Sequence, residues 1–241
     1  MEFTSVTIIV GATDESRAMT QTIETILHLC APEDIAKIIP VRSQNAAPGC
    51  IAAISAMEKA HPGKVHGMVQ TRPHIGGAIR DGFDAAQSSH IMLLPGDLAI
   101  GLACVPEMIR CAKEKPATIF KTSRWLQKNS FHGYSPLRRV LNGLAQVFLR
   151  LLFRAKITDL TNPVQIMPTS LYRSIDWQEL NFPFLEELIL VPLRLGTAFE
   201  EIPAQCYGRQ EGKSKNSAHQ TALYLRTALR VRFSLRKKLM K

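Results

Sequence analysis

The sequence, 241 residues long, contains no run of eighteen or more apolar residues, which argues against a membrane-spanning helix. Its amino terminus lacks the basic start, the long apolar stretch and the cleavage site of a secretory signal. The five cysteines are scattered without a CxxC pair, which argues against a zinc site or a disulfide framework. No homeodomain, zinc-finger or RNA-binding signature is present. We therefore expect a cytoplasmic protein with reduced thiols.

Acidic residues are scarce in two segments of an otherwise mildly acidic chain. Lys and Arg total 30 against 20 for Asp and Glu, a net charge of +10. Residues 121–156 hold eight basic residues and no acidic one, and residues 208–241 hold ten basic residues and a single acid, Glu211. Such segments require an anionic partner, which is nucleic acid, an anionic membrane face or a phosphorylated substrate.

Apolar residues alternate with these charges at helical spacing. Residues 136–156 predict a helix with one apolar face, and residues 217–241 predict a second basic amphipathic helix. Helices of this kind lie in the membrane interface with their charges near lipid phosphates, although an ordinary helix with a solvated basic face shows the same pattern. Nucleic acid is not expected, because few aromatic residues surround the charges. The apolar face of the first helix comprises Val140, Leu141, Leu144, Val147, Phe148, Leu151 and Leu152.

The first 120 residues alternate between short apolar runs and amphipathic segments. This pattern predicts an α/β fold, with a doubly wound, mostly parallel sheet flanked by helices. Gly76 and Gly77 are predicted to break the chain ahead of the third helix. Ligands of such sheets bind beyond the carboxyl ends of the strands. The predicted strands span residues 5–10, 36–41, 65–70, 90–94 and 117–121. The predicted helices span residues 16–29, 49–60, 79–86 and 106–113.

Candidate chemistry lies at one such strand end and in the second half of the chain. Asp97 follows the strand predicted at 90–94, where a carboxylate can bind a metal–diphosphate or orient a sugar, or can cap the next helix. Further on, the stretch GRQEGKSK carries three cations in a loop that suits neutralising a leaving diphosphate, or that is a solvated basic loop.

The order and spacing of six motifs resemble glycosyltransferase family 2, and within it the dolichol-phosphate mannose synthase type. VGATDES stands where such proteins have V-P-x-Y-N-E, and HIGGAIRDGFDAA followed by LLPGDL is similar to N-x-G-x-x-A-x-x-x-G-x-x-x-A followed by D-x-D-L. TSRW with LRRVLN resembles the acceptor-phosphate region S-R-Y and R-K-x-x-S, and DLTNPVQ resembles D-x-T-S-G-F-R. The stretch from Glu187 to Lys215 is similar to the family pattern E, G, E-x-P and R-x-x-G-x-S-K. The resemblance covers residues 5–216.

This resemblance implies a GT-A fold and an inverting hexosyltransferase. Residues 1–216 would form the catalytic domain, including an interfacial helix at 136–156, and residues 217–241 a basic amphipathic C-terminal helix. The implied reaction moves a sugar from a nucleotide-sugar to a polyprenyl-phosphate lipid by direct displacement at the anomeric carbon. The enzyme would be peripheral, on the cytoplasmic face of an anionic membrane, and nucleic acid is not an expected partner.

The resemblance also assigns roles to residues. It implies a catalytic set, a donor-binding set and an acceptor-phosphate set, with Asp97 also binding Mg²⁺ or Mn²⁺. The catalytic set comprises Asp97, Asp159 and Glu187. The donor-binding set comprises Asp14, Glu15, Arg209, Ser214 and Lys215. The acceptor-phosphate set comprises Arg124, Arg138 and Asn142.

The sequence departs from the family pattern around the donor. Pro95 replaces the first acid of D-x-D, and IIPVRSQN stands where D-D-x-S follows the second strand. Thr13, Pro163 and Gln165 also replace residues of the pattern. Three alternatives stay open. They are a family 2 transferase with a soluble or other acceptor, a non-catalytic relative that acts as a binding subunit, and a nucleic-acid binder that uses residues 208–241.

Overall fold

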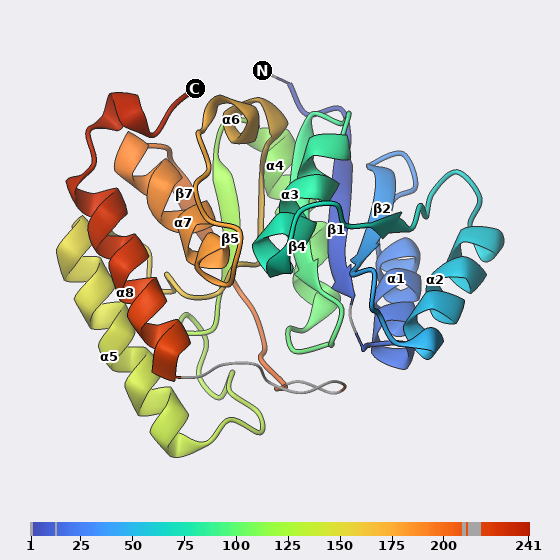
Figure 1. The fold of residues 1–241 in the computed structure, drawn as a ribbon, viewed down its shortest axis with the longest axis horizontal. Coiled ribbons are helices and arrows are strands. Elements are labelled where there is room, and N and C mark those ends of the chain that lie inside the picture. The colour runs from blue at the N-terminus through green and yellow to red at the C-terminus, as the bar shows by residue number, and fades with distance from the viewer. Residues whose placement is uncertain (1, 13, 209–210, 212–217) are drawn as a thin grey trace.

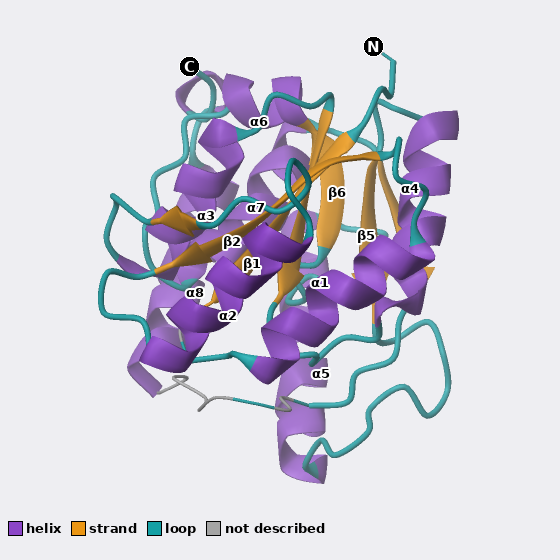
Figure 2. Cartoon of the chain, turned by 90° about the vertical axis from the view of Figure 1, so that its right-hand side faces the viewer, coloured by secondary structure: helices purple, strands orange, loops and turns teal. Residues whose placement is uncertain are grey.

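The computed structural model describes residues 2–12, 14–208, 211 and 218–241. These residues form a single sheet in the strand order β3-β2-β1-β4-β6-β5-β7, with helices on both faces (Figures 1 and 2). Only β6 runs antiparallel to its neighbours within the described sheet. The strands are β1 (Val6–Ala12), β2 (Ile35–Arg42), β3 (Met68–Val69), β4 (His90–Pro95), β5 (Ile119–Ser123), β6 (Gln165–Pro168) and β7 (Phe199–Pro203). The predicted mostly parallel α/β fold is confirmed.

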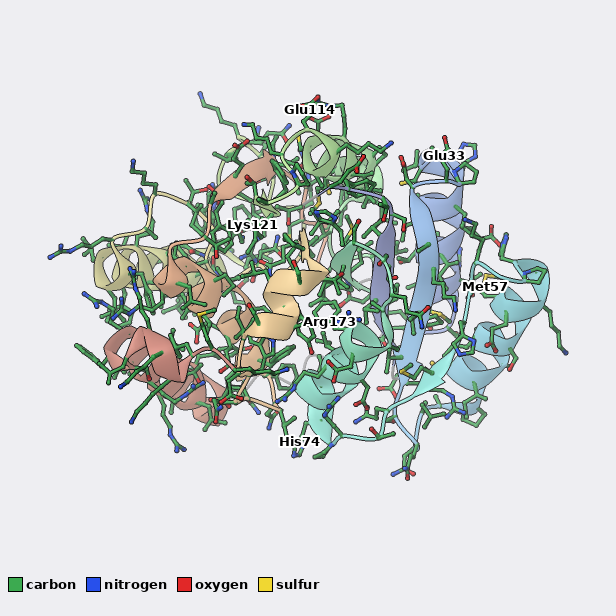
Figure 3. The ribbon with its side chains drawn as sticks, turned by 90° about the horizontal axis from the view of Figure 1, so that it is seen from above. Glu33, Met57, His74, Glu114, Lys121 and Arg173 are labelled. Carbon is green, nitrogen blue, oxygen red and sulfur yellow. The ribbon has the colours of Figure 1, made fainter. Side chains whose placement is uncertain are left out.

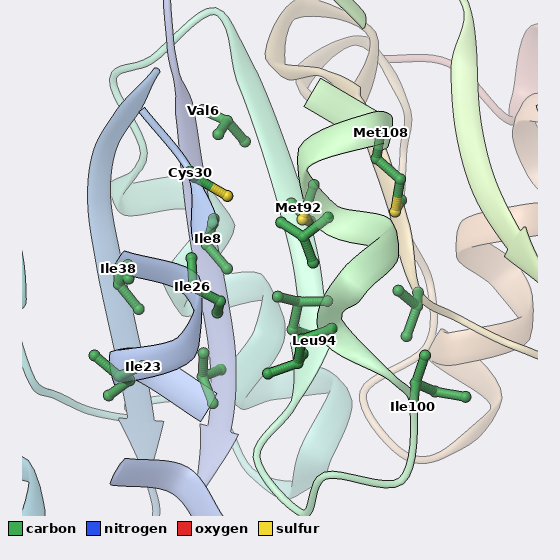
Figure 4. Packing of buried hydrophobic residues seen from close by; sticks show 14 of the residues in the cluster. Val6, Ile8, Ile23, Ile26, Cys30, Ile38, Met92, Leu94, Ile100 and Met108 are labelled. Carbon is green, nitrogen blue, oxygen red and sulfur yellow. The ribbon is translucent and has the colours of Figure 1, made fainter. Parts of the chain in front are cut away.

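Two hydrophobic layers hold the helices to the sheet. Along β1, Val6 and Ile8 face the layer that contains α1, α2 and α4 (Figure 4). Val10 faces the same layer, whereas Ile9 faces α3 and α7, as the two-residue period of a strand requires. Because both faces of the strand are covered, it reads as a continuous apolar run. The helices are α1 (Arg17–Leu29), α2 (Pro48–Ala60), α3 (His74–Ala85), α4 (Val105–Glu114), α5 (Pro136–Phe153), α6 (Thr169–Ser174), α7 (Pro183–Leu195) and α8 (Ala218–Phe233), with short 3-10 turns η1 (Leu102–Cys104) and η2 (Arg236–Lys238).

Two predicted boundaries are wrong. The strand predicted at 65–70 is reduced to Met68–Val69, with one isolated bridge between Val65 and Ile38. Helix α3 begins at His74 and so includes Gly76 and Gly77, which were expected to precede it. A Cβ on Gly76 would lie 2.7 Å from the Leu180 carbonyl, so these glycines serve close packing of the first helical turn rather than a chain break.

Helix α5 lies against the body with its apolar face outward. Leu144 and Leu151 are 62% and 75% exposed, whereas Gln146 on the opposite side is only 4% exposed. Helix α8 lies beside α5 and leaves Leu225 and Phe233 exposed (Figure 1). Both predicted apolar faces thus reach the surface. No helix within the described ranges has the length and apolar character that crossing a membrane requires.

Candidate active site

The carboxyl ends of β1 and β4 lie side by side and bring two predicted acids to one edge of the sheet. Gly11 pairs with Pro95 in the parallel ladder, so Glu15 and Asp97 follow neighbouring strand ends. Asp97 is 6% exposed, and its Oδ1 accepts the Ala99 N–H at 3.0 Å. The Asp14 N–H donates to Glu15 Oε2 at 3.1 Å. The sheet therefore places the predicted metal ligand and two of the predicted donor-binding residues at the same edge.

Gly96 permits this close approach of the two strands. A Cβ at residue 96 would lie 2.7 Å from the Gly11 carbonyl oxygen, a distance that a side chain cannot occupy without moving the backbone. Leu98, directly after Asp97, has a φ of 55°, in the left-handed region. Asp97 therefore lies in a turn, between the close approach at Gly96 and the left-handed backbone of Leu98.

Glu211 caps the amino terminus of α1. Its carboxylate accepts the Ser16 N–H and hydroxyl at 3.1 Å each and the Ala18 N–H at 2.8 Å. The hydrogen bond from the Ala18 N–H is the main cause that lowers the pKa of Glu211. This contact brings the segment after β7 to the turn between β1 and α1. The sequence signal was the single acid within residues 208–241.

A cavity of about 780 Å³ opens next to this cap, between α1 and the segment that follows Asp97. Arg17 and Gln21 of α1 line it, as do Leu98, Tyr207 and Glu211. Asp97 does not line the cavity, although the next residue, Leu98, does. Three predicted donor-binding residues, Arg209, Ser214 and Lys215, lie outside the described residues.

Arg124 and Asp159 form a buried, bidentate ion pair where β5 ends. Arg124 Nε and Nη2 lie 2.7 Å and 2.9 Å from the two carboxylate oxygens, and Arg124 Nη2 also donates to Thr161 Oγ1 at 2.8 Å. Burial acts to raise the pKa of Asp159, but the charge and hydrogen bonds of Arg124 outweigh it and hold the pKa far below its usual range. The pair engages Nε and Nη2, so phosphate binding by Arg124, as predicted, would have to use Nη1 of a side chain that is only 8% exposed.

Further buried polar groups, on β5 and β7, hold the loop that carries Asp159. Lys121 lies in the interior (Figure 3) and donates to the backbone carbonyls of Thr122 and Asp159. Burial lowers the pKa of Lys121. Glu201 on β7 accepts the N–H groups of Thr158 at 2.7 Å and Asp159 at 2.9 Å. Residue 159 is therefore held through its backbone as well as its side chain.

Helix α5 completes this cluster. Asn142 donates to Thr161 Oγ1 at 2.9 Å, so the structure brings Asn142, Arg124 and Asp159 together. Gln146, which sequence reasoning missed, donates to Asp159 Oδ1 at 3.0 Å. Arg138 lies in the exposed first turns of the same helix, where its backbone N–H donates to Oγ of Ser135, the N-cap residue. Of the predicted acceptor-phosphate residues, Arg138 thus has the exposed guanidinium.

Glu187 and its neighbour Glu186 are buried at the start of α7. Glu187 accepts the N–H groups of Gln178 and Glu179, and it forms a 2.6 Å ion pair with Arg230 on α8. Its contacts therefore lie on elements other than those around Asp159. Burial raises the pKa of Glu187, against the effect of Arg230. Burial also raises the pKa of Glu186, to about 8. Sequence reasoning missed Glu186, although the adjacent acids in an apolar stretch were a visible signal.

No protein-family model matches the sequence. Among solved structures, the chain is similar to glucosyl-3-phosphoglycerate synthase from Mycobacterium tuberculosis. For its complex with Mn²⁺, UDP and phosphoglyceric acid, the TM-score is 0.69 and the identity 16%, over 95% of this chain and 78% of that chain. For its complex with Mn²⁺, UDP and glucosyl-3-phosphoglycerate, the TM-score is 0.70 and the identity 15%, over 95% and 80% of the two chains. At this identity the similarity establishes the fold, which is the GT-A glycosyltransferase fold.

Proposed function

We propose that the protein is a glycosyltransferase that takes a sugar from a nucleotide-sugar donor and gives it to a phosphate-bearing acceptor. The observation that carries the proposal is the pair of acids, Glu15 and Asp97, at the joined ends of β1 and β4. A ligand of an open α/β sheet binds at this edge. The similar synthase was solved with UDP-glucose, Mn²⁺ and phosphoglyceric acid bound, which supports the donor class.

The residues present fit a divalent cation that is shared with the donor. Asp97 offers the hard oxygen ligand that Mg²⁺ and Mn²⁺ prefer, and such ions are commonly held by one or two carboxylates together with substrate phosphates. Within the described ranges no group of three His, Cys, Asp or Glu could hold a metal. Asp97 would therefore hold Mg²⁺ or Mn²⁺ jointly with the donor diphosphate. The bound cation would neutralise charge on the leaving diphosphate.

The proposed reaction is an inverting displacement. An oxygen of the acceptor phosphate attacks the anomeric carbon, and the bond from that carbon to the nucleotide diphosphate breaks. Because the phosphate is already ionised near neutral pH, the protein needs no strong general base and contributes position and charge. In this scheme Glu15 contacts the nucleotide, Asp97 orients the donor, and Arg138 meets the acceptor phosphate. The Arg124–Asp159 pair keeps the loop that carries Asp159 rigid.

Two kinds of phosphate-bearing acceptor are candidates: a polyprenyl phosphate attacks through a phosphate oxygen, whereas phosphoglycerate also offers a hydroxyl oxygen, whose proton a base must then remove. The phosphoglycerate of the similar synthase favours a soluble acceptor. The outward apolar face of α5 and α8 favours a polyprenyl-phosphate lipid, with the protein peripheral on the cytoplasmic face of an anionic membrane. Arg138, Arg139 and Arg150 are exposed along α5, and each cation near an anionic surface contributes about 1 kcal/mol. Burying a side chain such as Leu151 contributes about 1.5–3 kcal/mol at most.

A transfer assay tests the proposal and separates the two acceptors. UDP-glucose and other nucleotide-sugars are incubated with Mn²⁺ and either 3-phosphoglycerate or polyprenyl phosphate in anionic vesicles. We expect transfer to one acceptor, lost in Asp97→Asn and kept in the control Glu33→Gln, whose carboxylate is exposed at the periphery (Figure 3). Donor binding without transfer to any phosphate would instead support the non-catalytic binding subunit. If the protein neither binds the donor nor transfers the sugar, the proposal is refuted.

A further inference from the structure

Helix α5 has an unusual orientation for a surface helix. A helix normally buries its apolar stripe and exposes its polar one. In α5 most of the large apolar side chains are outward. Leu149 is buried, and Leu152 and Phe153 pack partly against the core, so apolar contacts hold the carboxyl-terminal part of the helix. In the part before Leu149 the buried side chain is that of Gln146, so polar contacts hold the helix there.

Gln146 uses both ends of its amide toward the body. Its Nε2 donates to Asp159 Oδ1 at 3.0 Å and to Thr161 Oγ1 at 2.8 Å, and its Oε1 accepts the Leu160 N–H at 2.7 Å. The same Nε2 lies 3.2 Å from Asn142 Oδ1, one turn earlier on α5. One buried amide thus joins α5 to three consecutive residues of the loop that carries Asp159.

Two other polar residues lie on the same side of α5 as Gln146, toward the exposed amino-terminal end of the helix. Arg138, Asn142 and Gln146 follow one another at four-residue intervals, so they lie on neighbouring positions of one side of the helix. With a rise of 1.5 Å per residue, Arg138 stands about 12 Å along the axis from Gln146. The rotation of the helix about its axis therefore decides where the Arg138 guanidinium lies relative to the Arg124–Asp159 pair.

We propose that Gln146 is a positioning residue that fixes the rotation of α5, and so sets Arg138 and Asn142 toward the acceptor side of the site. Without its three hydrogen bonds, the flanks of the outer apolar face would compete to turn inward, because burying them removes apolar surface from water. At Gly143 the helix packs directly against Trp125, since a Cβ there would lie 3.4 Å from the indole ring. The part concerning the acceptor rests on the proposed function; the part concerning rotation does not.

Thiol labelling measures the rotation directly. Leu141 and Val147 are 56% and 54% exposed and stand about 120° apart around the helix, on opposite flanks of the outer face. Leu141→Cys and Val147→Cys are made separately in a Cys111→Ala background, because the other cysteines are buried. With Gln146 present we expect similar maleimide labelling rates at both positions. In Gln146→Leu, rotation in either sense protects one thiol and exposes the other, and we expect the ratio of rates to change about tenfold, which corresponds to 1.4 kcal/mol.

The control is Gln87→Leu, the same chemical change at an exposed glutamine on the opposite edge of the sheet, before β4. It should leave the labelling ratio unchanged. A ratio that stays constant in Gln146→Leu, whatever happens to its thermal stability, overturns the proposal, because a residue with a merely structural role would lower the Tm without rotating the helix.

The transfer assay gives the functional readout. In Gln146→Leu we expect the acceptor KM to rise about tenfold while the donor KM stays within about twofold, because only the acceptor side moves. An equal rise of both KM values overturns the acceptor-side role. If the unmodified protein transfers no sugar, the proposed function fails, and the labelling ratio still decides whether Gln146 sets the rotation.

Discussion

The adjacent acids at the start of α7 should respond in opposite ways to the same substitution. Glu186 is 6% exposed, and its Oε2 has no hydrogen-bond partner within the described part of the chain. Burial, and then the negative charge of Glu179, raise the pKa of Glu186 from 4.5 to about 8. Tyr224 on α8 also lies close to it. At neutral pH the folded protein therefore holds a protonated carboxyl at this position.

The sign and size of the effect follow from linkage. The unfolded carboxyl loses its proton near pH 4.5, whereas the folded carboxyl keeps it to about pH 8. The unfolded state thus binds fewer protons over this interval, so the free energy of unfolding falls as the pH rises from 4.5 to 8. At pH 7 this destabilisation is about 3 kcal/mol. Glu186→Gln removes the ionisable group and should raise the Tm at pH 7–8 by roughly 5–10 °C.

The matched control is Glu187→Gln, one residue later. Glu187 accepts backbone N–H groups through both oxygens and is paired with Arg230, so an amide NH₂ there must face another donor. We expect Glu187→Gln to lower the free energy of unfolding by about 1–3 kcal/mol. Urea unfolding at pH 5 and pH 8 measures both variants. A gain for Glu186→Gln that is the same at the two pH values, or a loss at pH 8, would refute the reasoning.

Three further outcomes are expected. Asp159→Ala leaves Arg124 as an uncompensated buried charge and should cost about 3–5 kcal/mol of unfolding free energy by urea titration, whereas a loss under 1 kcal/mol would contradict a buried pair. Glu211→Ala should cost about 1 kcal/mol, since it removes the cap of α1, and hydrogen exchange should show faster opening of that first turn; unchanged exchange would count against the cap. Leu144→Ser with Leu151→Ser should leave the Tm unchanged but reduce co-sedimentation with anionic vesicles at least tenfold if the acceptor is a lipid. Equal sedimentation of the variant and the unmodified chain would favour the soluble acceptor.

The fold was predictable where the sequence signal is local. Runs such as SVTIIV and HIMLL are long enough to mark buried parallel strands, and the intervening helices have one-sided apolar patterns. Strand β6 (Gln165–Pro168) was missed because it has only four residues and its partners, β4 and β5, are determined by long-range pairing. Helix α7 was missed because it is buried on nearly every side and so has no apolar stripe.

For the candidate site, the sequence suggested residues but not the contacts between them. The motif order selected Arg124, Asn142 and Asp159, which the structure brings together, although 35 residues separate the two ion-paired partners. Gln146 was not found, because a polar residue within an apolar helix looks solvent-facing until the helix is known to be turned outward. The cap formed by Glu211 likewise depends on a contact with Ser16, 195 residues away.

Calorimetric titration of UDP-glucose in the presence of Mn²⁺ tests the central claim most directly, using the unmodified chain, Asp97→Asn and Glu33→Gln. The account predicts binding by the unmodified chain and by Glu33→Gln, a marked loss of affinity when Mn²⁺ is removed, and little or no Mn²⁺ dependence in Asp97→Asn. Binding that is equally tight in all three proteins, with and without the cation, would contradict the assignment of Asp97 to the donor site.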